Sequence, residues 1–165
     1  MTSKALNLSF LEPNPAKSIY NMPIPIVESK YTSMYFHEEH RLFEQFWYPE
    51  SEFMTEEDFK QIHLSWVQKL IKHRYNIHRA LLDNLHNLFE MSSELQQWHD
   101  QHIHQVVLQN LPDGPNLKVA IVASEDFLTQ LGIEHTFLKN QELNSNVYYF
   151  TNIREARDWI MKRNI

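Results

Sequence analysis

The most constraining feature of this sequence is a run of apolar residues in its C-terminal half. Val119–Ala123 are all apolar, and Leu117 extends the run towards a loop signal at 111–116 that holds two prolines and a glycine. A strand that is apolar at consecutive positions is buried on both faces, which is typical of the parallel sheets of α/β domains. The run therefore predicts a central strand covered by helices on both sides.

Helix and strand signals alternate around this strand. A β-hairpin is expected over about 27–48, where strand-like runs flank the polar tetrad His37–His40. The other expected elements are strands at 80–83 and 147–150 and helices at about 55–74, 93–110, 124–132 and 152–163. Alternating strands and helices imply parallel crossovers. The predicted fold class is α/β, with a mixed, mostly parallel sheet, an N-terminal antiparallel β-hairpin and helices packed on the sheet.

Capping residues predict where three of these helices begin. Thr55 precedes the acidic residues Glu56–Asp58, and Asn152 precedes the last helix. Ser93 and Gln96 have the spacing of a reciprocal capping box. Side-chain oxygens at these positions accept hydrogen bonds from the N–H groups that a first helical turn leaves unpaired.

The first 25 residues differ in composition from the rest of the chain. They hold four of the seven prolines, Pro13, Pro15, Pro23 and Pro25. Proline discourages helix interiors and central strands, so an extended N-terminal arm is expected over 1–25. Its apolar side chains predict that parts of it lie on the domain or on a second copy. The remaining length, 26–165, suits a single domain.

Composition excludes several functional classes. The formal net charge of −6 opposes binding to nucleic acid. The sequence has no cysteine, which excludes disulfides, thiolate catalysis and cysteine-ligated metals. With only two glycines, Gly114 and Gly132, it cannot contain a dinucleotide-binding fingerprint or a P-loop. No apolar run approaches the roughly 20 residues that span a bilayer, so the expected location is the cytoplasm.

Several segments match a known family in their order and spacing. They extend over about 28–160, roughly four-fifths of the chain, and comprise Phe46–Pro49, Met54–Phe59, Ala80–Asn84, Glu94–Trp98, Lys118–Val122, Tyr149–Phe150, Glu155–Ala156 and Trp159–Ile160. In these segments the chain resembles the STAS-like (SpoIIAA-like) superfamily, in particular small bacterial proteins of the Bacteroidetes lineage. The resemblance implies helices packed on a mixed sheet, and a role in regulation or binding between proteins more than in catalysis.

The resemblance also implies a candidate regulatory site. Anti-sigma-factor antagonists of this superfamily carry a phosphorylatable serine at the start of the helix after the third strand, within an Asp-Ser-Ser-Gly-like signature. Here the matching region, Asp83–Ser93, has a longer connection and no glycine. Ser92 or Ser93 could be that serine by position. Helix capping explains both serines equally well.

Histidines provide a second set of candidates, since the chain has ten of them. At the α-helical period, His99 and His102 fall on one stripe, with His104 on the opposite face. The stripe predicts two imidazoles that look towards the sheet, over a small pocket that His63 helps to close. The alternative is that these histidines are partly buried and hydrogen-bonded to backbone or water. No metal site is assigned.

Two further places in the sequence are candidate sites. Asp83 follows a predicted parallel strand, where open α/β sheets place ligand-binding groups, although an Asx-type turn explains it as well. Trp47 and Tyr48 lie beside the arm and are candidates for a partner surface, although most tryptophans in a domain of this size belong to the core.

The expected function is a non-enzymatic STAS-like domain that binds a protein partner or forms a homodimer through the hairpin edge and the arm. The alternative is a domain that binds a small apolar or anionic, lipid-like ligand in a pocket between helices and sheet. No catalytic residue and no cofactor is assigned, which leaves an enzyme as the third possibility.

Overall fold

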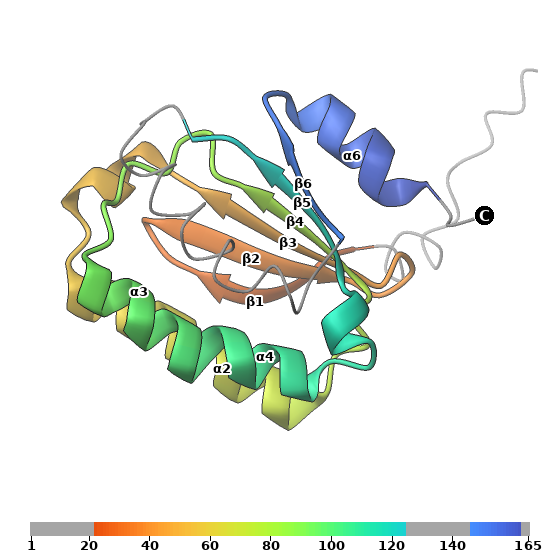
Figure 1. The fold of residues 1–165 in the computed structure, drawn as a ribbon, viewed down its shortest axis with the longest axis horizontal. Helices are drawn as coiled ribbons and strands as arrows, with labels where there is room; N and C mark the ends of the chain where they lie inside the picture. Colours follow the sequence, from red (N-terminus) through yellow and green to blue (C-terminus); the bar gives the residue numbers. More distant parts are fainter. Residues whose placement is uncertain (1–21, 125–145, 163–165) are drawn as a thin grey trace, which may run out of the picture.

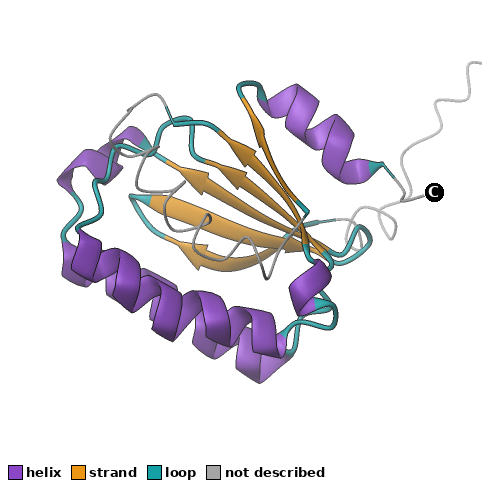
Figure 2. Cartoon of the chain, viewed as in Figure 1, coloured by secondary structure: helices purple, strands orange, loops and turns teal. Residues whose placement is uncertain are grey.

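The computed structural model describes residues 22–124 and 146–162, which form a six-stranded sheet with helices on both faces (Figure 1 and Figure 2). The strands are β1 (Ile24–Glu28), β2 (Thr32–His37), β3 (Leu42–Trp47), β4 (Arg79–Asp83), β5 (Lys118–Val122) and β6 (Val147–Phe150). The α-helices are α2 (Glu56–His73), α3 (Ser93–His99), α4 (Gln105–Asn110) and α6 (Ile153–Met161). The shorter helical turns are η1 (Pro49–Phe53), η2 (Asp100–His104) and η3 (Gly114–Asn116).

The strands lie in the sheet in the same order as in the chain. β1, β2 and β3 pair antiparallel, and β3 to β6 pair parallel. The α/β fold class and the mixed sheet with an N-terminal antiparallel hairpin are therefore confirmed. Residues 1–21 of the predicted arm, and 125–132 of the predicted third helix, lie outside the described residues.

One strand was not predicted. Ile24 and Pro25, assigned to the arm from the sequence, belong to β1 at the edge of the sheet. Pro25 lies opposite Tyr35, and the register shifts between Pro25 and Val27. Proline is tolerated on an edge strand, because a missing N–H costs little where no further strand pairs with it. The prolines therefore led to the prediction of an arm where the structure has a strand.

The predicted helix caps are correct in two cases and shifted by one residue in the third. At α2, the Thr55 hydroxyl accepts from the Asp58 N–H and the Asp58 carboxylate accepts from the Thr55 N–H, each at 3.1 Å. At α3, the cap is Ser92, whose hydroxyl accepts from the Leu95 N–H at 3.2 Å, so the predicted box led by Ser93 is wrong. The Asn152 side chain caps α6.

The central strand β5 is buried on both faces, as the apolar run predicts. Val119 and Ile121 join the main core cluster, on the face covered by α2, α3 and α4. Ala120 and Val122 pack with Leu81 against α6 on the opposite face, where Ala156 and Ile160 are fully buried. No helix among the described residues is both long and apolar enough to cross a membrane.

A buried carboxylate fixes α6 to the sheet. Glu44 of β3 is only 3% exposed and accepts from Arg157 Nη1 of α6 at 2.6 Å. Its other oxygen is 2.8 Å from His37 Nε2. Because both carboxylate oxygens have partners, the cost of burying the charge is offset and the position of α6 relative to β3 is defined.

Gly114 allows η3 to lie against the end of α4. A Cβ at this position would be 2.0 Å from the carbonyl oxygen of Leu108 and 2.9 Å from its carbonyl carbon. Both atoms belong to the backbone, so a side chain here can be accommodated only if η3 moves away from α4.

We expect Gly114→Ala to lower the free energy of unfolding by about 1–3 kcal/mol, the usual cost of overpacking. Urea unfolding followed by circular dichroism measures the change. Asn116→Ala, at an exposed position of the same turn, is the matched control and should be close to neutral. Equal urea midpoints for the two variants would contradict the close approach.

Candidate functional site

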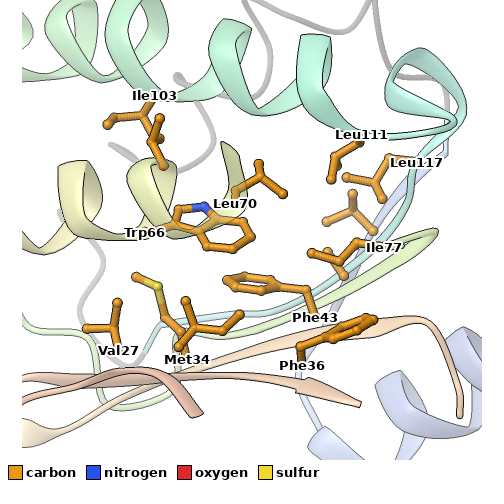
Figure 3. Packing of buried hydrophobic residues seen from close by; sticks show 14 of the residues in the cluster. Val27, Met34, Phe36, Phe43, Trp66, Leu70, Ile77, Ile103, Leu111 and Leu117 are labelled. Atoms are coloured by element: carbon orange, nitrogen blue, oxygen red, sulfur yellow. The ribbon is translucent and has the colours of Figure 1, made fainter. Parts of the chain in front are cut away.

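A cavity of about 110 Å³ lies between the sheet and the helical layer of α2, η2 and α4. Most of its wall is apolar: Phe43, Trp66, Ile77, Ala80, Leu82, Ile103, Val107, Leu108, Leu111, Leu117 and Val119. Its polar lining consists of Gln45, His63, His99 and His104. Figure 3 shows how Trp66 of α2 and Phe43 of β3 face each other, with Ile103, Leu111, Leu117 and Ile77 around them.

Aromatic rings form a continuous group along one side of the cavity. Phe43 and Trp66 are stacked, with ring centroids 4.5 Å apart and an interplanar angle of 23°. His63 lies near Phe59, at 4.0 Å between centroids, and meets His99 edge-on at 5.2 Å and 84°. Flat rings held face to face or edge to face are a rigid surface, suited to another flat apolar group.

The structure places His63 and His99 on the cavity wall and His102 away from it. His102 is exposed, its ring is stacked on Trp98 at 5.3 Å, and its Nδ1 donates to the Trp98 carbonyl at 3.0 Å. The expectation that His102 looks towards the sheet is therefore wrong. His104, expected on the opposite face, lines the cavity instead.

The cause of this exchange is the helical turn η2, which is π-helical. The N–H of Gln105 donates to the carbonyl of Asp100, five residues earlier. A π-turn holds an additional residue, so positions five apart lie on one face. His99 and His104 have this spacing, whereas the α-helical period that pairs His99 with His102 does not apply here. Single π-turns within α-helices are frequent at functional sites.

Burial keeps the cavity histidines uncharged at neutral pH. It lowers the pKa of His63 to about 4, against a partial opposing effect of the bond to Phe59. It also holds the pKa of His99 well below the ordinary value, helped by the neighbouring His63 and His104. Burial lowers the pKa of His104 as well, and Asp100 opposes that shift. The polar part of the wall therefore offers dipoles and no net charge.

The tautomer of His63 follows from its hydrogen bond. Nδ1 lies 2.8 Å from the carbonyl oxygen of Phe59, one turn earlier on α2. A carbonyl oxygen only accepts, so Nδ1 carries the proton and Nε2 of the neutral ring is an acceptor. Because the bond to Phe59 is the only one that His63 makes among the described residues, Nε2 is available to an occupant of the cavity.

His99 differs from His63 in the hydrogen bonding of its Nδ1 atom. Its Nδ1 is fully buried and has no hydrogen-bond partner within the described part of the chain. A buried polar atom left unpaired costs about 1–3 kcal/mol. The three histidines do not form a metal site: among residues 22–124 and 146–162, no group of three or more His, Asp or Glu side chains is arranged to hold an ion.

Three other predicted residues lie away from the cavity. Asp83 ends β4, and its Oδ1 accepts from the Leu85 N–H at 3.1 Å, which is the Asx-type turn given as the alternative. Ser92 caps α3 and donates to Glu56 Oε1 at 2.7 Å. Ser93 is exposed at the first position of α3. Phosphorylation of either serine stays a prediction.

The two residues of the candidate partner surface have different environments. Trp47 is 6% exposed and is stacked on Phe59 at 6.5 Å, so its assignment to an exposed surface is wrong and the core alternative holds. It faces the helical layer because alternate residues of β3 point to opposite faces. Tyr48 is 37% exposed, and its hydroxyl is 2.8 Å from Ser33 Oγ.

The sequence reasoning missed Gln45 and the aromatic pair Phe43–Trp66 as site residues. Gln45 is 8% exposed, and its amide nitrogen donates to Thr32 Oγ1 at 3.4 Å. It lies between Phe43 and Trp47 on the buried face of β3, where strict alternation favours an apolar residue. The polar amide of Gln45 between two buried aromatic residues was the sequence signal that could have identified this wall of the cavity.

The lowered pKa of His63 predicts an acid-dependent loss of stability. An unfolded histidine titrates near pH 6.5. Because the folded pKa is lower, the contribution of His63 is fully present above about pH 6.5 and is lost as the pH falls towards 4. We expect His63 to account for about 2 kcal/mol of the decrease in unfolding free energy between pH 7 and pH 5.

Urea unfolding at both pH values measures this decrease in the native chain, in His63→Phe and in the control His102→Phe. The native chain and the control should lose equal free energy, and His63→Phe should lose less by the stated amount. An equal decrease in unfolding free energy in all three proteins would contradict the assignment of a neutral, buried His63.

Comparison of the chain with protein-family models, with curated proteins and with solved structures finds no match in any of the three. The cavity and its side chains are therefore the basis for inferring a function.

Proposed function

We propose that this chain is a non-enzymatic binding domain whose cavity takes a compact apolar molecule. The observation that carries the proposal is a partly open cavity of about 110 Å³ with an apolar and aromatic wall and uncharged histidines. A largely apolar pocket with a few polar groups is the common form of a small-molecule site.

The volume limits the size of the ligand. An apolar cavity of about 150 Å³ engineered into another protein binds benzene and stays free of water. The cavity here is somewhat smaller, so it suits a single ring or a short branched chain. We therefore expect a compact ligand in place of the lipid-like ligand with a long tail.

The resemblance to STAS-like domains supports a binding role more than a catalytic one. The chemistry of the cavity wall is also more typical of a binding site than of a catalytic one. Its polar groups are neutral, and Asp83, the one acid considered as a site residue, lies away from it in a turn.

We expect benzene at ten times its Kd to stabilise the native chain by about 1.4 kcal/mol. For a chain of this size, that raises the Tm by about 4 °C. Val107→Phe, which fills the cavity from α4, should abolish the shift while the Tm of the free protein is kept or raised.

The matched control is Gln109→Phe, which adds the same side chain at an exposed position of α4 and should keep the benzene shift. Xenon binding, observed by ¹²⁹Xe NMR, gives a second measurement that does not depend on thermal unfolding. Binding of neither benzene nor xenon by the native chain would refute the proposal.

A second candidate, self-association, is favoured by two exposed aromatic residues. Phe53 is 76% exposed and is the last residue of the short helix η1 after β3, and Tyr48, just before η1, is 37% exposed. Exposed aromatic side chains are enriched at protein interfaces. We propose, as this second function, that two copies associate through this end of β3.

Sedimentation velocity tests this candidate at high micromolar concentration. The native chain should form dimers and Phe53→Ser should be monomeric. Ile71→Ser, at a residue of α2 that is 48% exposed, is the control and should still dimerise. A monomeric native chain at every concentration would exclude this interface.

A further inference from the structure

The polar groups of the cavity restrict the ligand further than its volume does. Among residues 22–124 and 146–162, no lysine, arginine, aspartate or glutamate lines it. The histidines are neutral because burial disfavours their charged forms. An anion placed here would lose its hydration without gaining a counter-charge, which is costly. The lining therefore selects against the anionic ligand that the sequence left open.

The acceptor nitrogen of His63 favours a ligand that carries a hydrogen-bond donor. His63 uses its one N–H on the Phe59 carbonyl, so the ring can offer only an acceptor, Nε2, to the cavity. A ligand that brought only acceptors would leave Nε2 unpaired, whereas an O–H group would satisfy it.

Gln45 offers the ligand both a hydrogen-bond donor and an acceptor. One of its amide hydrogens is directed to Thr32 Oγ1, which leaves one hydrogen and the carbonyl oxygen of the amide for an occupant. A hydroxyl group both donates and accepts. One hydroxyl group can therefore donate to His63 Nε2 and accept from the Gln45 amide N–H. An ether or a ketone can only accept, so it would leave His63 Nε2 unpaired.

The shape of the wall favours a flat ring. Phe43 and Trp66 form a stacked pair that lines the cavity, and Ala80 and Val119 of the adjacent strands bring only short side chains to it. His63 and Trp66 are three residues apart on α2, so the acceptor nitrogen and the aromatic surface belong to one helix face. A ring against Trp66 can therefore direct a substituent towards His63.

We propose that the cavity binds a neutral, single-ring molecule with one hydroxyl group, of the phenol class. The ring lies along Phe43 and Trp66, and the hydroxyl donates its hydrogen to His63 Nε2. This inference rests on the proposed binding function and names the ligand class for the same cavity.

Isothermal titration calorimetry with phenol, toluene and benzoate at pH 7.5 tests the proposal. Phenol and toluene differ by a hydroxyl in place of a methyl group, so the ratio of their Kd values isolates the hydrogen bond. We expect the native chain to bind phenol about tenfold more tightly than toluene. Benzoate should bind more weakly than either.

Two variants assign the preference to one nitrogen. His63→Phe keeps an aromatic ring of similar size next to Phe59 and should lose the preference for phenol while it still binds toluene. His102→Phe changes a histidine outside the cavity and should keep the native ratio. If His63→Phe does not fold, ¹⁵N NMR of the native chain replaces it, and phenol should shift the resonance of His63 Nε2 where toluene does not.

The outcomes separate this inference from the proposed function. If toluene and phenol both fail to bind, the binding function itself is refuted. If both bind equally, or if His63→Phe keeps the native ratio, the cavity binds apolar rings and the phenol class is refuted. Tighter binding of benzoate would likewise overturn the inference and indicate an anion site.

Discussion

The rest of the structure depends on burying β4 and β5 on both faces. A parallel pair with no solvated side must be covered twice, and parallel neighbours can be joined only by long crossovers. The chain meets both demands with α2 before β4 and with α3, η2 and α4 before β5, which lie together on one face. On the other face α6 covers the same two strands and is fixed by the Glu44–Arg157 pair. The cavity lies between the sheet and the helical layer that the two crossovers create.

Much of the fold could be predicted because its signals are local. The capping box at Thr55 and the continuous apolar run at β5 each depend on a few neighbouring residues, and both predictions are confirmed. β1 was missed because proline at position 25 indicates an arm in the sequence, whereas an edge strand tolerates it. Whether this segment is an arm or an edge strand depends on the strand that pairs with it. A local sequence pattern does not contain that information.

The candidate site was harder to predict than the fold for a geometric reason. His63 and His99 could be placed on apolar faces from their spacing, and both line the cavity. His102 was chosen over His104 because a uniform α-helical period was assumed, and the π-turn η2 changes that period for five residues. The volume itself depends on how completely side chains from the sheet and from the helical layer fill the space between them. A sequence pattern says which side chains meet, and it does not say whether they leave a gap.

The π-turn also sets the relative orientation of the two α-helices that flank it. In a continuous α-helix of the same length, positions 99 and 104 would lie about 140° apart around the helix axis, because each residue turns the chain by about 100°. The wider turn of η2 removes most of that angle, so His99 of α3 and His104 face the cavity together with Val107 and Leu108 of α4. In this chain the winding of a single turn, more than the identity of its residues, therefore decides which side chains reach the cavity.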